Sequence, residues 1–99
     1  MSILESNEFI DRQVEILDAV SKIIEPDDKI LDAWVSEPAI ITVLPYKYVY
    51  YSMYVTTEKR RVFKIPIFEQ TYYNNELLHQ KLYSVKEALE EMSMWTEEE

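Results

Sequence analysis

The spacing of apolar positions changes along the chain, and each spacing predicts a different element. From Asn7 to Glu25 apolar residues recur at helical intervals, which predicts an amphipathic helix that ends where Pro26 restricts the preceding residue. Ser2 and Asn7 are equally good starts for it. The apolar positions are Phe9, Ile10, Val14, Ile16, Leu17, Val20, Ile23 and Ile24. They cover an arc of roughly 180°, so the helix is expected to contact more than one neighbour.

Between residues 30 and 68 the pattern alternates with the period of two that is typical of strands. The four expected strands are Ile30–Ser36, Ala39–Leu44, Tyr48–Thr57 and Arg61–Phe68. The links between them are short, so consecutive strands are expected to be antiparallel neighbours in a meander. Pro66 cannot donate a backbone hydrogen bond, which places the fourth strand at an edge of the sheet.

One face of these strands is expected to form the core under the helices, and the other face is rich in aromatic residues. The aromatic residues predicted on this second face are Trp34, Tyr48, Tyr50, Tyr54 and Phe68. The charged residues Lys64 and Asp32 are expected on the same face. Exposed patches of this kind usually mark association, and Tyr and Trp are enriched at interfaces. We therefore predict that the five aromatic side chains form an interface with a second subunit or a platform for a ligand.

Helical spacing returns after an expected cap at Asn75. The apolar positions are Leu78, Leu82, Val85, Leu89 and Met92, with Leu77, Ala88 and Trp95 on the flank. Ser84-x-x-Glu87 matches a capping box that would divide the segment into two helices. Because the apolar stripe keeps its phase across Ser84, we expect one helix instead. Residues 96–99 are expected to be a frayed acidic tail, since carboxylates oppose the negative end of the helix dipole.

These elements predict one α+β domain over residues 1–99. Its order is an N-terminal helix, a four-stranded antiparallel meander and a C-terminal helix, with both helices packed on one face of the sheet. The chain has 99 residues, of which 47% are apolar, and this suffices for one compact core. No apolar run is long enough to span a membrane, and the first residues lack the pattern of a signal peptide. We therefore expect neither secretion nor membrane insertion.

The net charge of −9 is unevenly distributed. Residues 1–28 carry eight acids and two bases, residues 29–71 four acids and six bases, and residues 72–99 seven acids and two bases. The predicted helices are therefore acidic and the predicted sheet is slightly basic. One row of carboxylates lies on the polar side of the first helix: Glu8, Asp11, Glu15 and Asp18. It is either an ordinary solvated face or a row that docks on a basic partner surface, where charge speeds association.

The basic residues cluster at one predicted hairpin. They are Lys59, Arg60, Arg61 and Lys64. Next to an aromatic face, such a cluster is one way to hold single-stranded nucleic acid by base stacking and phosphate contact. The other reading is that the charges keep an edge hairpin from pairing with other chains. The acidic net charge disfavours non-specific nucleic-acid binding.

Candidate chemistry is sparse. Cysteine and glycine are absent, which excludes disulfides, thiolate chemistry and glycine-rich phosphate loops. His79 is the one histidine, and Glu76-x-x-His79 lacks the second copy that a di-metal site needs. Asp27, Asp28 and Asp32 near Lys29 are better explained by a turn and a strand than by a nuclease centre. We expect no catalytic residues, no metal ligands and no cofactor.

Three segments carry a family resemblance. They are the helix opening Asn7-Glu-Phe-Ile-Asp-Arg-Gln13, the strand Leu44-Pro-Tyr-Lys-Tyr-Val-Tyr-Tyr-Ser-Met-Tyr54 and the acidic end of the chain. In length and texture the whole chain resembles small proteins of filamentous viruses of hyperthermophilic archaea, the Acidianus filamentous virus group. The resemblance implies a viral protein of no assigned activity with relatives in other such viruses, and it carries no functional residue over to this chain. Together with the missing signal-peptide pattern and membrane span, it leads us to expect a thermostable protein in the host cytoplasm or the virion. Sparse Asn and Gln and the absent Cys are compatible with a hot habitat.

The sequence therefore favours a non-enzymatic interaction protein that forms a homodimer and binds a host or viral protein. The alternative is a small nucleic-acid-binding or regulatory protein that uses the aromatic face and the basic hairpin.

Overall fold

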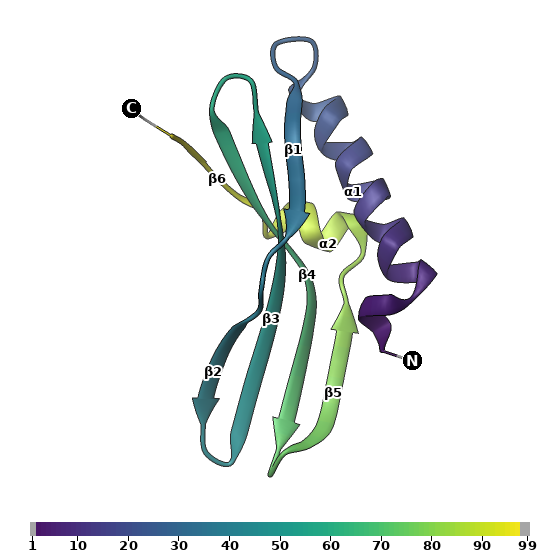
Figure 1. The fold of residues 1–99 in the computed structure, drawn as a ribbon, viewed down its shortest axis with the longest axis vertical. Helices are drawn as coiled ribbons and strands as arrows, with labels where there is room; N and C mark the ends of the chain where they lie inside the picture. The colour runs from purple at the N-terminus through teal and green to yellow at the C-terminus, as the bar shows by residue number, and fades with distance from the viewer. Residues whose placement is uncertain (1, 98–99) are drawn as a thin grey trace.

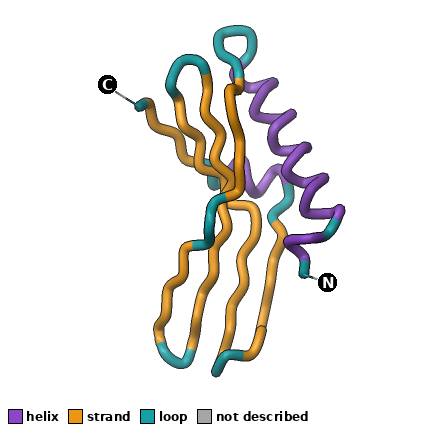
Figure 2. Tube along the Cα trace, in the orientation of Figure 1, coloured by secondary structure: helices purple, strands orange, loops and turns teal. Residues whose placement is uncertain are grey.

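The computed structural model describes residues 2–97, which form an α+β fold, as predicted. One antiparallel sheet of six strands is combined with two α-helices and a short 3-10 helix (Figures 1 and 2). The helices are η1 (Ile3–Glu5), α1 (Asn7–Ile24) and α2 (Val85–Glu90). The strands are β1 (Ile30–Val35), β2 (Ala39–Val43), β3 (Tyr46–Thr57), β4 (Arg61–Tyr73), β5 (Glu76–Leu82) and β6 (Ser93–Thr96).

The long hairpin of β3 and β4 runs through the whole molecule, and four shorter strands flank it. β1 and β2 both pair with β3, one beyond the other, and β6 and β5 pair in the same way with β4. The sheet therefore has two four-stranded halves that share the hairpin (Figure 1). We call the half with β1, β6 and the helices the helical half. The other half, residues 39–50 and 69–81, is the blade.

The core lies in the helical half, between one face of the sheet and the two α-helices. Ser6 caps the start of α1, because its hydroxyl accepts the Phe9 N–H, and the helix ends before Pro26. The buried side chains are contributed by α1, β3, β4 and the α2 region: Phe9, Ile16, Val20, Ile24, Met53, Val55, Phe63, Ile65, Ile67, Phe68, Tyr83 and Ala88. The Arg12 guanidinium donates to the Tyr83 carbonyl and ties α1 to the start of α2. Both helices therefore lie on one face, as predicted.

The predicted meander is only partly correct, because β1 does not turn back to pair with β2. The Ser36 N–H donates to the Ser52 carbonyl, so the chain after β1 continues along β3. The ladder then resumes in the same direction, with Val35 opposite Met53 and Ala39 opposite Tyr50. A strand as long as β3 can accommodate both partners end to end.

The prediction of a single C-terminal helix is wrong, since this segment forms β5, α2 and β6. Asn74 and Asn75 have positive φ values of 47° and 66°, which make a two-residue turn that pairs β5 with β4. The Ser84–Glu87 capping box then starts the short helix α2. The tail expected to fray from residue 96 contains the last residue of β6, and the Glu97 N–H donates to the Arg60 carbonyl. Glu98 and Glu99 lie outside the described residues.

The edge position predicted for the fourth strand is also incorrect, because β4 lies between β3 on one side and β5 and β6 on the other. The β5 ladder begins at Phe68 and the β6 ladder ends at Lys64, so Pro66 lies in the gap between these two partners. A residue without a backbone N–H is tolerated there, because neither β5 nor β6 pairs with it.

Candidate interaction surface

The predicted aromatic face exists, with one exception. Trp34 stacks on Tyr54 at a centroid distance of 5.9 Å, and Tyr48 stacks on Tyr50 at 6.5 Å. These four residues share the face opposite the helices, because their positions alternate with the core residues of β1 and β3. The face runs over both halves of the molecule.

The exception is Phe68, which was assigned to this face and is instead 2% exposed in the core. Its ring contacts Phe9 and Tyr51 at centroid distances of 6.3 Å and 5.7 Å. The reason is a β-bulge: Ser52 lies opposite Pro66 and Tyr51 lies opposite Phe68, so Ile67 is an extra residue on β4. One extra residue reverses the alternation beyond it.

Three aromatic residues of the same face were not predicted. Trp95 of β6 lies 6.4 Å from Tyr54, edge to face. Tyr46 stacks on Tyr48 at 6.1 Å and meets Tyr73 edge to face at 5.2 Å. Trp95 was missed because its segment was expected to be helical. Tyr73 was missed because the predicted strands end at Phe68, although the β-propensity of Tyr72-Tyr73 before an Asn-Asn turn is a strand signal.

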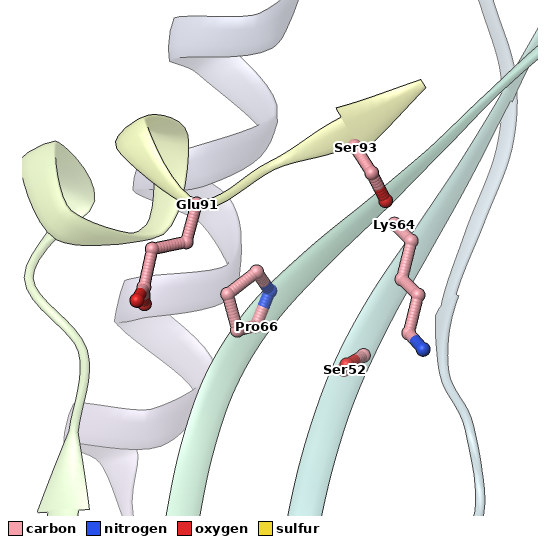
Figure 3. A pocket seen from close by; sticks show the side chains of 5 residues that line it. All are labelled: Ser52, Lys64, Pro66, Glu91 and Ser93. Atoms are coloured by element: carbon pink, nitrogen blue, oxygen red, sulfur yellow. The ribbon is translucent and has the colours of Figure 1, made fainter. Parts of the chain in front are cut away.

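A shallow pocket of about 290 Å³ opens beside Pro66, where β4 has no neighbour on its outer side. Ser52, Lys64, Pro66, Glu91 and Ser93 line it, and Lys64 and Glu91 lie on opposite sides of the proline ring (Figure 3). The pocket brings one amine and one carboxylate to the aromatic face of the helical half.

The blade differs from the helical half because neither α-helix covers it (Figures 1 and 2). Among its side chains only Val49 is buried. Nine large apolar side chains are exposed there: Ile40, Ile41, Val43, Leu44, Tyr46, Tyr50, Tyr73, Leu77 and Leu78. A patch of this size in a folded protein usually marks an association surface.

The charges of the blade cancel, and both of its bases are engaged. The two acids Glu69 and Glu76 balance the two bases Lys47 and Lys81. The net charge of −9 is therefore carried by the rest of the chain. The Lys47 ammonium lies 4.6 Å above the Tyr72 ring. Lys81 pairs with Glu87 at 2.5 Å, and this hydrogen bond raises the pKa of the lysine and lowers that of the glutamate.

The predicted basic cluster is divided. Lys59, Arg60 and Arg61 lie at the β3–β4 turn, where Arg60 has a φ of 65°, whereas Lys64 belongs to the pocket on the aromatic face. Arg61 forms an ion pair with Asp28, because its guanidinium lies 3.6 Å from the buried carboxylate of that residue.

Asp28 explains why this turn is fixed. Its carboxylate accepts hydrogen bonds from the Thr57 hydroxyl and from the backbone N–H groups of Lys29 and Lys59. Burial raises the pKa of this carboxyl, but the hydrogen bonds and the Arg61 charge outweigh burial and hold the pKa below its ordinary value. Asp28 is thus a structural link between the end of α1 and the hairpin turn.

The predicted acidic row lies on the exposed side of α1, as its spacing indicates. Glu8, Asp11, Glu15 and Asp18 are all exposed. Two of them form ion pairs within the helix, Glu15 with Arg12 at 3.7 Å and Asp18 with Lys22 at 2.9 Å. The row therefore has the geometry of a solvated helix face, and it also remains accessible to a partner.

Within residues 2–97 no group of three or more His, Cys, Asp or Glu side chains is placed to hold a metal ion. His79 lies exposed on β5 opposite Thr71. Among the described helices none is long and apolar enough to cross a membrane. Comparisons of the chain with protein-family models, curated proteins and solved structures find no match.

Proposed function

We propose that the protein is a non-enzymatic interaction protein that forms a homodimer and binds a host or viral protein through the blade. The observation that supports this most strongly is a four-stranded sheet segment without net charge and without helical cover, in a chain of net charge −9. Keeping nine large apolar side chains in water costs about 25 cal/mol for each Å² of apolar surface that a partner would otherwise cover. Association with a partner would remove this apolar surface from water and so stabilise the complex.

Position 43 on the blade and position 14 on α1 provide a matched test, because Val43 and Val14 are both 60% exposed. A photo-crosslinking amino acid is introduced at one position at a time in producing cells. The proposal predicts covalent protein adducts from position 43 and few from position 14. Equal yields from the two positions, or adducts from position 14 alone, would overturn it.

A nucleic-acid function is the second candidate. It is favoured by the stacked rings of Trp34 and Tyr54, with Trp95 edge to face on Tyr54 and Lys64 opposite Tyr54. It is weaker because of the net charge and because Arg61 is engaged by Asp28. Both tryptophans of the chain lie on this face, so their fluorescence reports on it directly. Single-stranded oligonucleotides that quench it at low salt, with a steep loss as salt rises, would support this candidate. Unchanged fluorescence at low salt would exclude it.

A further inference from the structure

The sheet has four edge strands, and three of them carry features that prevent pairing with another chain. β1 has a register shift between Ile30 and Asp32 and the charge of Asp32. β5 has a register shift at its pairing with Thr71 and Tyr72, and it contains Glu76 and Lys81. β6 is only four residues long. Bulges, charges and short length are the usual protections of an exposed edge.

β2 lacks these protections apart from being short. Its sequence Ala-Ile-Ile-Thr-Val has no charge and no proline, its register with β3 is continuous over Ala39–Val43, and all five residues are exposed. We infer that β2 pairs antiparallel with β2 of a second copy, across a two-fold axis at Ile41. The two blades then form one continuous sheet of eight strands. This inference rests on the proposed function, and it assigns the homodimer contact to the β2 edge of the blade.

The side chains of β2 are complementary to their own copy under this symmetry. Ile41 meets Ile41, Ala39 meets Val43, and Ile40 meets Thr42, so every pair contains a β-branched residue and no charge meets a like charge. Ala39, Ile41 and Val43 lie opposite Tyr50, Tyr48 and Tyr46 and share their face. The tyrosines of both copies therefore border the new seam on one side of the sheet.

The charge distribution favours a second copy in this orientation. Antiparallel pairing of the two β2 strands points the helical halves in opposite directions, so the acidic helices lie at the two ends of the dimer. The seam itself joins two segments without net charge. Charges separated by more than about 8 Å are largely screened at physiological salt. A parallel arrangement would instead place two acidic halves side by side.

The chain contains no cysteine, so a single introduced thiol gives a clean test. Residues directly opposite each other in antiparallel strands have Cα atoms about 4.5–5.5 Å apart, which is within the range of a disulfide. Ile41→Cys is therefore expected to form a covalent dimer under mild oxidation. Leu78→Cys, on the protected edge β5 and at least as exposed, is the control and is expected to form no disulfide-linked dimer. Equal cross-linking of both variants, or cross-linking of Leu78→Cys alone, would overturn the inference.

Charge substitution tests the position of the axis. Ile41→Lys and Ile41→Glu each place like charges against themselves across the seam, so each variant alone is expected to lose dimerisation at least tenfold. An equal mixture of the two is expected to recover it as a Lys–Glu heterodimer. Failure of the mixture to recover dimers, while wild type dimerises, would place the axis elsewhere and contradict the proposed seam.

Light scattering of the wild-type chain separates this inference from the proposed function. The inference predicts a mass twice that of the 11.9 kDa chain at micromolar concentration. A monomer that still gives adducts with other proteins from position 43 overturns self-pairing, and with it the homodimer, but leaves the binding of another protein through the blade intact. A monomer without such adducts overturns both.

Discussion

The carboxylate of Asp28 accepts a 2.6 Å hydrogen bond from the hydroxyl of Thr57, and both side chains are buried. This bond, with the contacts from Arg61, Lys29 and Lys59, joins the loop after α1 to the end of β3. The buried carboxylate thus holds the tip of the central hairpin against the first helix.

A pH dependence of stability follows from this arrangement. The pKa of Asp28 is lower in the folded state than its ordinary value of 3.8, so the ionised carboxylate stabilises the fold above that value. This contribution is lost as pH falls through the folded-state pKa. We expect Asp28→Asn to lower the thermal midpoint by several degrees at pH 7. On acidification, the midpoint of this variant should then fall less than that of the wild type. Asp27→Asn, at the exposed neighbouring position, is the control and should follow wild type in thermal melts from pH 7 to pH 2.

The bulge at Ile67 predicts opposite consequences for two aromatic residues that the alternating pattern placed on one face. Phe68→Ala should cost about 3–5 kcal/mol of the free energy of unfolding, because a fully buried ring is removed. Tyr50→Ala should cost about 1 kcal/mol or less in the dilute monomer, since this side chain is partly exposed. Urea unfolding at low protein concentration measures both. Similar costs for the two variants would mean that Phe68 lies on the outer face after all.

Changing Glu8, Asp11, Glu15 and Asp18 to Lys tests the role of the acidic row. Exposed ion pairs contribute little, so we expect the free energy of unfolding to change by less than about 1 kcal/mol. If the row docks on a basic protein, association with a partner captured at the blade should slow and lose its salt dependence. An unchanged on-rate would identify the row as a solvated face only.

The class of the fold and the central hairpin could be predicted from the sequence, because both depend on local spacing. The helix before Pro26 and the dense β-branched and aromatic runs of β3 and β4 are strong local signals. Trp34, Tyr48, Tyr50 and Tyr54 were placed correctly for the same reason: no bulge interrupts their alternation with the core.

The remaining features depend on tertiary pairing. The apolar spacing of Leu78 and Leu82 fits a helix, but the open edge of β4 and the Asn74-Asn75 turn make their segment a strand. That turn was a usable signal, since Asn tolerates positive φ. Pro66 was another, because proline within a sheet indicates either an edge or a bulge. Nothing in the link after β1 distinguishes a turn from the extended crossing that lets β1 and β2 share β3.

The most direct test of the blade as a self-association surface is amide hydrogen exchange at two protein concentrations. The account predicts that the edge-facing amides of Ala39–Val43 exchange more slowly in the concentrated sample, because they donate to the second copy. The amides of Glu76–Leu82 on the opposite edge should exchange at the same rate in both samples. Exchange in β2 that does not depend on concentration, or protection that arises in β5 instead, would contradict it.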